Sequence, residues 1–183
     1  LRVVFNQDKN TTLVAVNLLY EIGAKHEDDD ATGFTHLFEH LMFSGSKNFE
    51  NYDQIVERLG GESNAFTNND ITNYYLSVPN IYLQYALDLE ADRMQNLNLN
   101  QKSLDIQKSV VIEEFKQRYI NQPYGDLWKE IRQLSFTLHP YQHQTIGKCI
   151  EHIENVSLER AKQFYENYYT PSNAILAISG NVE

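Results

Sequence analysis

Apolar side chains recur at helical spacing between residues 34 and 42. Five of them follow the i, i+3, i+4, i+7, i+8 pattern that forms one stripe along a helix, namely Phe34, Leu37, Phe38, Leu41 and Met42. This stripe predicts a helix that buries one face in a core. Gly45 lies where the helix is expected to stop, and Thr32 or Thr35 lies where its N-cap is expected.

Segments rich in β-branched and aromatic residues predict strands at residues 2–5, 12–22, 62–67, 72–78 and 173–179. The second of these segments is so apolar that we expect it to be buried on both faces. The third and fourth segments are joined by the turn-forming sequence Asn68-Asn69-Asp70. They are therefore expected to pair as a hairpin.

Helical patterns follow at residues 52–59, 81–94, 103–119, 126–138 and 157–168. Gly60-Gly61 ends the first of these helices, and Pro123-Tyr124-Gly125 separates the third from the fourth. Strands and helices are interspersed without a strict βαβ alternation. The sequence therefore predicts an α+β fold, in which helices pack on a mostly antiparallel sheet.

Length and composition suit one globular domain spanning residues 1–183, since 42% of the residues are hydrophobic and 22% are charged. The net charge of −10 argues against nucleic-acid binding, which needs clustered Lys and Arg. No apolar run approaches the roughly 18 residues that a membrane-spanning helix needs. The single Cys149 excludes an internal disulfide, and the sequence indicates no particular compartment.

His36 and His40 lie four residues apart, on the side of the predicted helix opposite the apolar stripe. Side chains at this spacing are about 5–6 Å apart, so both imidazoles could bind one Zn²⁺ at about 2.0–2.1 Å. Glu39 shares this side of the helix, where its carboxylate could take a proton from a zinc-bound water molecule. The alternative is an ordinary solvated face that carries a metal-free histidine pair.

Catalytic zinc usually has three protein ligands and one open position, so the two histidines require a third ligand. The adjacent residues Glu113 and Glu114 are the best candidates. On a helical wheel Glu113 points away from the apolar side of its helix, whereas Glu114 lies at the flank of the buried stripe. That position can reach a site between packed elements, which favours Glu114. The alternative is that both glutamates are surface residues.

Other groups of possible metal ligands are weaker candidates. The three aspartates at residues 28–30 could bind calcium, but a solvated loop before a helix N-terminus is the stronger interpretation. His139 and His143 could form a second pair, although Pro140 prevents their presentation on one helix. Cys149 has no Cys or His at the usual zinc spacing, so we expect it to be buried.

The H-x-x-E-H motif lies within a longer pattern that covers essentially the whole sequence. This pattern comprises Gly33–Phe43, Gly45, Gly60-Gly61, residues 64–67, 72–75 and 110–114, His139-Pro140-Tyr141, Gly147 and residues 168–180. In these motifs and in their order the chain resembles the inverzincin peptidases of the pitrilysin family. This family includes mitochondrial processing peptidase and insulin-degrading enzyme.

The resemblance implies a two-layer pitrilysin-like sandwich with one zinc ion. It implies that His36, His40 and Glu114 bind this ion and that Glu39 is the general base. The implied function is that of a zinc-dependent endopeptidase, which hydrolyses peptides or extended protein segments.

In family members, a strand corresponding to Asn64, Ala65 and Phe66 lies beside the cleft. The resemblance implies that a peptide substrate adds to it as an edge strand. Many members have an acidic residue where this chain has Gln107. An uncharged hydrogen-bonding group is therefore expected beside the ligands.

Family enzymes pair this domain with a similar one that closes the cleft. The chain opens inside a strand-like run at Leu1 and stops just after another at Glu183, so we expect it to be the N-terminal part of a longer polypeptide. The partner would be a second homologous domain or subunit, and the isolated domain is expected to be weakly active or inactive. Two alternatives stay open. One is a non-catalytic partner or structural subunit, and the other is the fold-related S-ribosylhomocysteine lyase group, which needs a reactive cysteine near the metal.

Overall fold

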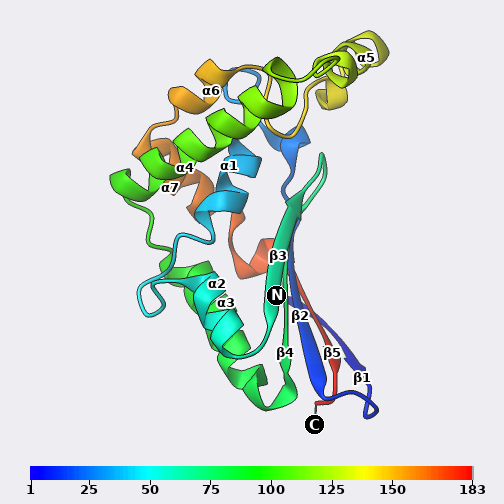
Figure 1. Cartoon of the computed structure of the whole chain (residues 1–183), viewed down its shortest axis with the longest axis vertical. Helices are drawn as coiled ribbons and strands as arrows, with labels where there is room; N and C mark the ends of the chain where they lie inside the picture. The colour runs from blue at the N-terminus through cyan, green and yellow to red at the C-terminus, as the bar shows by residue number, and fades with distance from the viewer. Residues whose placement is uncertain (183) are drawn as a thin grey trace.

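Five strands form one sheet in the computed structural model, which describes residues 1–182 (Figure 1). In chain order the strands are β1 (Arg2–Gln7), β2 (Leu13–Tyr20), β3 (Glu62–Thr67), β4 (Thr72–Pro79) and β5 (Ala174–Gly180). They lie side by side in the order β1-β5-β2-β4-β3. The β1–β5 pair is parallel, and the other three pairs are antiparallel. The predicted mostly antiparallel sheet is therefore confirmed.

The helices lie on one side of this sheet, and α5 extends beyond its end (Figure 1). Their bounds are α1 (Phe34–Leu41), α2 (Tyr52–Arg58), α3 (Leu83–Asn96), α4 (Gln101–Phe115), α5 (Leu127–Ser135), α6 (Ile150–Glu154) and α7 (Leu158–Tyr168). A π-helix, Lys116–Ile120, directly continues α4. Short 3₁₀ turns lie at Ala24–His26, Asn80–Tyr82, Pro140–Gln142 and Pro171–Asn173.

The core between helices and sheet consists of two clusters of buried side chains. The first joins α1, α4 and α7 to one half of the sheet and contains Tyr74 and Tyr169. The second joins α2 and α3 to the other half and contains Val56 and Leu89. Phe43, just after α1, packs against both clusters. The α+β prediction is confirmed, with α1 at the centre of the first cluster.

The prediction that the second strand is buried on both faces is wrong. Burial alternates along β2: Val14 and Val16 are buried, whereas Leu13, the first residue of the strand, is 47% exposed. The helices cover one face of the sheet only, so every second side chain of an antiparallel strand stays open to solvent. An apolar sequence alone did not distinguish one covered face from two.

The metal-motif helix begins differently from the prediction. Gly33 precedes α1 in the left-handed conformation, with a φ of 87°. The carboxylate of Glu27 accepts hydrogen bonds from the backbone N–H groups of Gly33 at 2.8 Å and Thr35 at 2.7 Å. The hydroxyl of Thr32 lies 2.8 Å from Nδ1 of His152 instead. Neither threonine caps the helix, because a carboxylate from the preceding loop occupies that position.

Other element boundaries differ by a few residues. Helix α4 begins at Gln101, earlier than predicted, because Asn100 accepts a hydrogen bond from the backbone of Ser103 as its N-cap. Helix α5 ends at Ser135, and α6 was not predicted, since five residues are too few to show a helical period. Within residues 1–182, every helix is too short or too polar to traverse a lipid bilayer.

Candidate metal centre

Helices α1 and α4 bring the three predicted ligands together. The side of α1 opposite its apolar stripe carries His36, which is 8% exposed, and His40, which is half-buried. Helix α4 packs against α1 and presents the half-buried Glu114 to both imidazoles. Oε2 of Glu113 instead lies 3.8 Å from Nζ of Lys116 on the surface. Of the two adjacent glutamates, Glu114 is thus the one that faces both histidines.

The three side chains have the spacing of ligands around one ion. Oε2 of Glu114 lies 3.4 Å from Nε2 of His40 and 3.7 Å from Nε2 of His36. All three candidate ligand atoms lie within 4.8 Å of one another. Zinc–ligand bonds of about 2.0–2.1 Å put two ligands of a tetrahedron about 3.3 Å apart. The two Glu114–histidine separations are close to the edge of such a tetrahedron, so this donor set fits zinc.

The electrostatics favour metal-binding protonation states. Burial lowers the pKa of His36 to about 4, against an opposing effect of Glu114, so this imidazole is neutral at neutral pH. Interaction with His40, together with the positive charge of Arg118, lowers the pKa of Glu114 against the opposing effect of burial. A neutral imidazole and an ionised carboxylate are the forms that bind metal ions.

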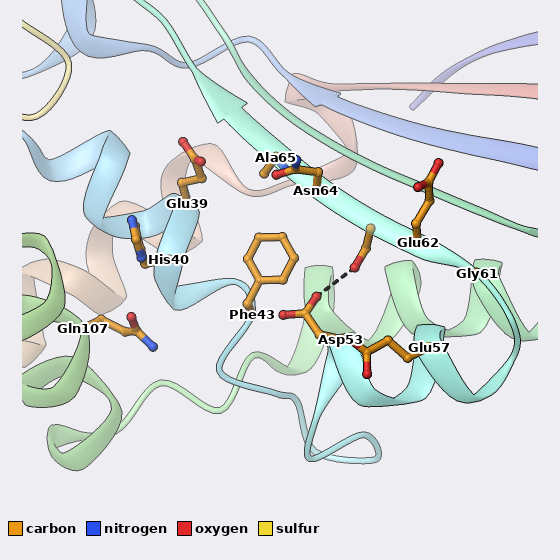
Figure 2. A pocket seen from close by; sticks show the side chains of 11 residues that line it. Glu39, His40, Phe43, Asp53, Glu57, Gly61, Glu62, Asn64, Ala65 and Gln107 are labelled. Carbon is orange, nitrogen blue, oxygen red and sulfur yellow. Dashed lines mark hydrogen bonds between the residues drawn. The ribbon is translucent and has the colours of Figure 1, made fainter. Parts of the chain in front are cut away.

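Glu39 lies on α1 beside the ligands, toward β3 (Figure 2). Its Oε2 accepts a hydrogen bond from the hydroxyl of Thr67, at the end of β3, at 2.5 Å. Burial raises the pKa of Glu39 above its ordinary value, and the Thr67 hydrogen bond opposes this effect. A carboxylate held in this way can exchange a proton with a group in the adjoining pocket.

A pocket of about 570 Å³ opens beside Glu39. Its lining comes from α1 (Glu39 and His40), α2 (Asp53 and Glu57), α4 (Gln107) and β3 (Asn64 and Ala65), as Figure 2 shows. The amide of Gln107 donates to the hydroxyl of Ser44 at 3.4 Å. The predicted base, one predicted ligand and two predicted substrate-binding residues therefore line the same pocket.

Strand β3 is an edge of the sheet and pairs with β4 alone. Its backbone N–H at Ala65 donates to the side-chain oxygen of Asn64 at 2.8 Å. Side chains alternate along the strand, so Phe66 points to the face opposite Ala65 and is 44% exposed. Asn64 and Ala65 are among the residues that line the pocket, and Phe66 is not.

Sequence reasoning missed Thr67, Arg118 and Phe43. Arg118 Nη2 lies 2.6 Å from Oε1 of Glu114. Its position four residues after Glu114 was a usable signal, because oppositely charged residues at this helical spacing commonly pair. Thr67 carried no such signal, since its partner Glu39 is on another element.

The aspartate-rich loop forms ion pairs. Asp28 lies 2.9 Å and Asp30 lies 3.5 Å from the guanidinium of Arg160, and Asp29 lies 2.6 Å from Nζ of Lys148. The three carboxylates thus face basic side chains, in agreement with the interpretation as a solvated loop.

The remaining candidates lie away from the pocket. Nδ1 of His139 accepts the backbone N–H of Tyr141, and Nδ1 of His143 lies 3.2 Å from the carbonyl of Gln144. Cys149 is free and half-buried, rather than buried as expected. Within the described part of the chain, one group of three or more His, Cys, Asp and Glu residues has metal-binding spacing, and it is the group described above.

Comparison with known proteins identifies the family. The sequence profile described as Insulinase (Peptidase family M16) matches residues 2–146. The chain belongs to peptidase family M16. This M16 chain is 36% identical over 177 residues to zinc protease PqqE of Helicobacter pylori, covering 96% of this chain and 40% of that protein. It is 24% identical over 185 residues to the probable mitochondrial-processing peptidase subunit beta of Arabidopsis thaliana, covering 100% and 34%.

Solved M16-type structures share the fold. A protease from Helicobacter pylori aligns with a TM-score of 0.94 at 36% identity, covering 99% of this chain and 44% of that chain. Pitrilysin aligns with a TM-score of 0.84 at 23% identity, covering 99% and 20%. The resemblance to the pitrilysin family is confirmed, and the chain spans less than half the length of these relatives.

Proposed function

We propose that this M16 domain is the zinc-binding part of an endopeptidase that cleaves peptides or extended protein segments. The observation that carries the proposal is the approach of His36, His40 and Glu114 to within 4.8 Å at their ligand atoms. Glu39 and the edge strand β3 adjoin this group at one pocket. Relatives named as zinc proteases support the same conclusion.

His36, His40 and Glu114 would hold the zinc ion. When bound, the ion would supply Lewis acidity, which polarises a peptide carbonyl and lowers the pKa of water so that it can lose a proton as it attacks. Glu39 would accept the proton of the attacking water and pass it to the leaving amine, a role worth about 10²–10⁴-fold in rate. The Thr67 hydroxyl holds one oxygen of Glu39 and so fixes the direction of its carboxylate.

The substrate would lie along β3 as an added strand. The open edge of β3 offers backbone groups to an extended peptide, and Asn64 and Ala65 line the pocket at this edge. The Ala65 N–H is bonded to the side chain of Asn64 in the free domain. A bound peptide carbonyl would replace that amide oxygen.

A second domain, in the same chain or in a partner, would cover the remaining side of the cleft. Relatives more than twice as long as this chain support this part of the proposal. Helix α5 supports it as well, because its apolar residues face solvent: Trp128 is 66% and Leu134 is 82% exposed. An apolar stripe of this kind is typical of a surface that another domain covers.

The substitution Glu39→Gln in the full-length protein tests the proposed function. Gln keeps an oxygen for the Thr67 hydrogen bond but cannot accept the proton. We expect stoichiometric zinc to remain while peptide cleavage falls by about 10²–10⁴-fold. Glu113→Gln, a surface change beside the ligand Glu114, is the matched control and should leave both unchanged. Cleavage by Glu39→Gln near the wild-type rate would rule out Glu39 as the base, and a zinc-free wild type would favour the non-catalytic alternative.

A further inference from the structure

The two carboxylate oxygens of Glu114 face different partners. Oε2 points to the imidazoles of His36 and His40, at 3.7 and 3.4 Å. Oε1 lies 2.6 Å from Nη2 of Arg118, with which it forms an ion pair. One oxygen is therefore available to a metal ion, and the other is already occupied by a cation.

The backbone that presents Arg118 is a departure from regular helix. Directly after α4, residues Lys116–Ile120 form a π-helix. Such turns are rare in proteins, and those that occur are often found at functional sites. The ring centroids of Phe115 and Tyr119 lie 5.2 Å apart. Phe115 belongs to the first core cluster, and Tyr119 packs against that cluster. This packing fixes the π-helical turn while the Arg118 side chain, 60% exposed, remains at the surface beside Glu114.

Carboxylates bind metal ions through one oxygen or through both. Two imidazoles and a two-oxygen carboxylate would supply four ligand atoms, so that a water molecule would become a fifth ligand. Catalytic zinc needs three protein ligand atoms and an open position. We propose that Arg118 is a positioning residue, which retains Oε1 of Glu114 and thereby keeps this glutamate a one-oxygen ligand. This inference rests on the proposed function, because it presumes that the group binds a metal.

A surface ion pair without a role at the metal centre is the competing explanation. The same turn provides an example for comparison, since Nζ of Lys116 lies 3.8 Å from Oε2 of Glu113 and both side chains are exposed. Such exposed pairs at helical spacing contribute little to the free energy of unfolding, and this pair includes none of the three proposed metal ligands. Lys116→Met therefore removes a similar charge from the same π-helix and serves as the matched control for Arg118→Met.

Cobalt substitution in the full-length protein tests the inference, because Co²⁺ in four-coordinate sites absorbs visible light more strongly than in five-coordinate sites. We expect Arg118→Met to bind one Co²⁺ with weaker visible absorption than wild type. Lys116→Met should match wild type, and Arg118→Lys, which keeps a charged donor, should restore most of the absorption. With zinc bound, kcat of Arg118→Met should fall by about 10–100-fold.

The possible results separate this inference from the proposed function. Identical cobalt spectra for wild type and Arg118→Met would overturn the positioning role. Loss of the metal from Arg118→Met, with wild type still binding it, would overturn that role as well. Neither result would contradict the proposed zinc site of the wild type. Failure of wild type to bind stoichiometric cobalt or zinc would overturn both. A weaker spectrum in Lys116→Met as well would show that any charge on the π-helix has the same effect, which also contradicts a specific role for Arg118.

Discussion

Glu90 and Arg93 form a buried ion pair on α3, and breaking it should destabilise the domain strongly. The side chains of Arg93 and Glu90 are 2% and 5% exposed. Nε and Nη2 of Arg93 donate to the two oxygens of Glu90 at 2.7 and 2.8 Å, and the Tyr52 hydroxyl donates to Oε1 at 2.5 Å. The guanidinium carbon lies 4.3 Å from the ring centroid of Tyr52 and 4.6 Å from that of Tyr74.

The magnitude follows from the charge that Glu90→Gln leaves behind. The Arg93 guanidinium cannot release its proton, since Glu90 and the surrounding tyrosines raise its pKa further against the opposing effect of burial. Removing one partner of a buried pair costs about 3–5 kcal/mol, a large part of the roughly 5–15 kcal/mol that stabilises a domain. Adding Arg93→Met removes the unpaired charge. We therefore expect the double variant to lose less than the sum of the single losses, with a coupling free energy of about 2–3 kcal/mol.

Urea unfolding of wild type, both single variants and the double variant, followed by far-UV circular dichroism, measures this coupling. Glu21→Gln is the control, because Glu21 forms an exposed pair with Arg2 at 2.5 Å. This control should cost less than about 1 kcal/mol. A loss in Glu90→Gln as small as in Glu21→Gln, or strict additivity in the double variant, would show that burial does not make the Glu90–Arg93 pair indispensable.

Two further predictions concern the substrate strand and the cap of the metal-motif helix. Ala65→Pro removes the edge N–H of β3, so we expect KM for a peptide to rise about tenfold with unchanged zinc content; an unchanged KM would exclude this edge as the peptide site. Burial raises the folded-state pKa of Glu27 from 4.5 to about 7, against opposing hydrogen bonds from Thr35 and Gly33. The folded state then binds more protons than the unfolded state between these pH values, so the free energy of unfolding should fall as pH rises through them. Glu27→Gln should flatten this dependence in urea unfolding at pH 5 and 7.5, and an equal slope in both proteins would assign it to other groups.

The sequence predicted those parts of the site that depend on one helix. His36, Glu39 and His40 follow from the face opposite a local apolar stripe, and Glu114 follows from the flank of another. Helical geometry fixes such relations over a few residues, without knowledge of the rest of the fold. The resemblance then supplied the pairing of the two helices, which periodicity alone could not.

Relations between distant segments were not predictable from local patterns. Glu27 caps α1 from a loop, and Thr67 meets Glu39 across 28 positions in the sequence. The apolar pattern of β2 gave no measure of how many faces the helices cover. Each of these features depends on which segments pack together, and that information is absent from the spacing of residues along one element.

The residues around the pocket are held in place by two different core clusters. The proposed ligands His36, His40 and Glu114 lie on helices packed in the first cluster, whereas α2, which lines another side of the pocket, is packed in the second. Phe43 packs against both clusters, and the Arg93 guanidinium lies 5.8 Å from its ring centroid. Loosening the buried ion pair should therefore shift the pocket wall relative to the metal ligands. Because α1 and α4 are held by the first cluster, such a shift should weaken peptide binding more than zinc binding.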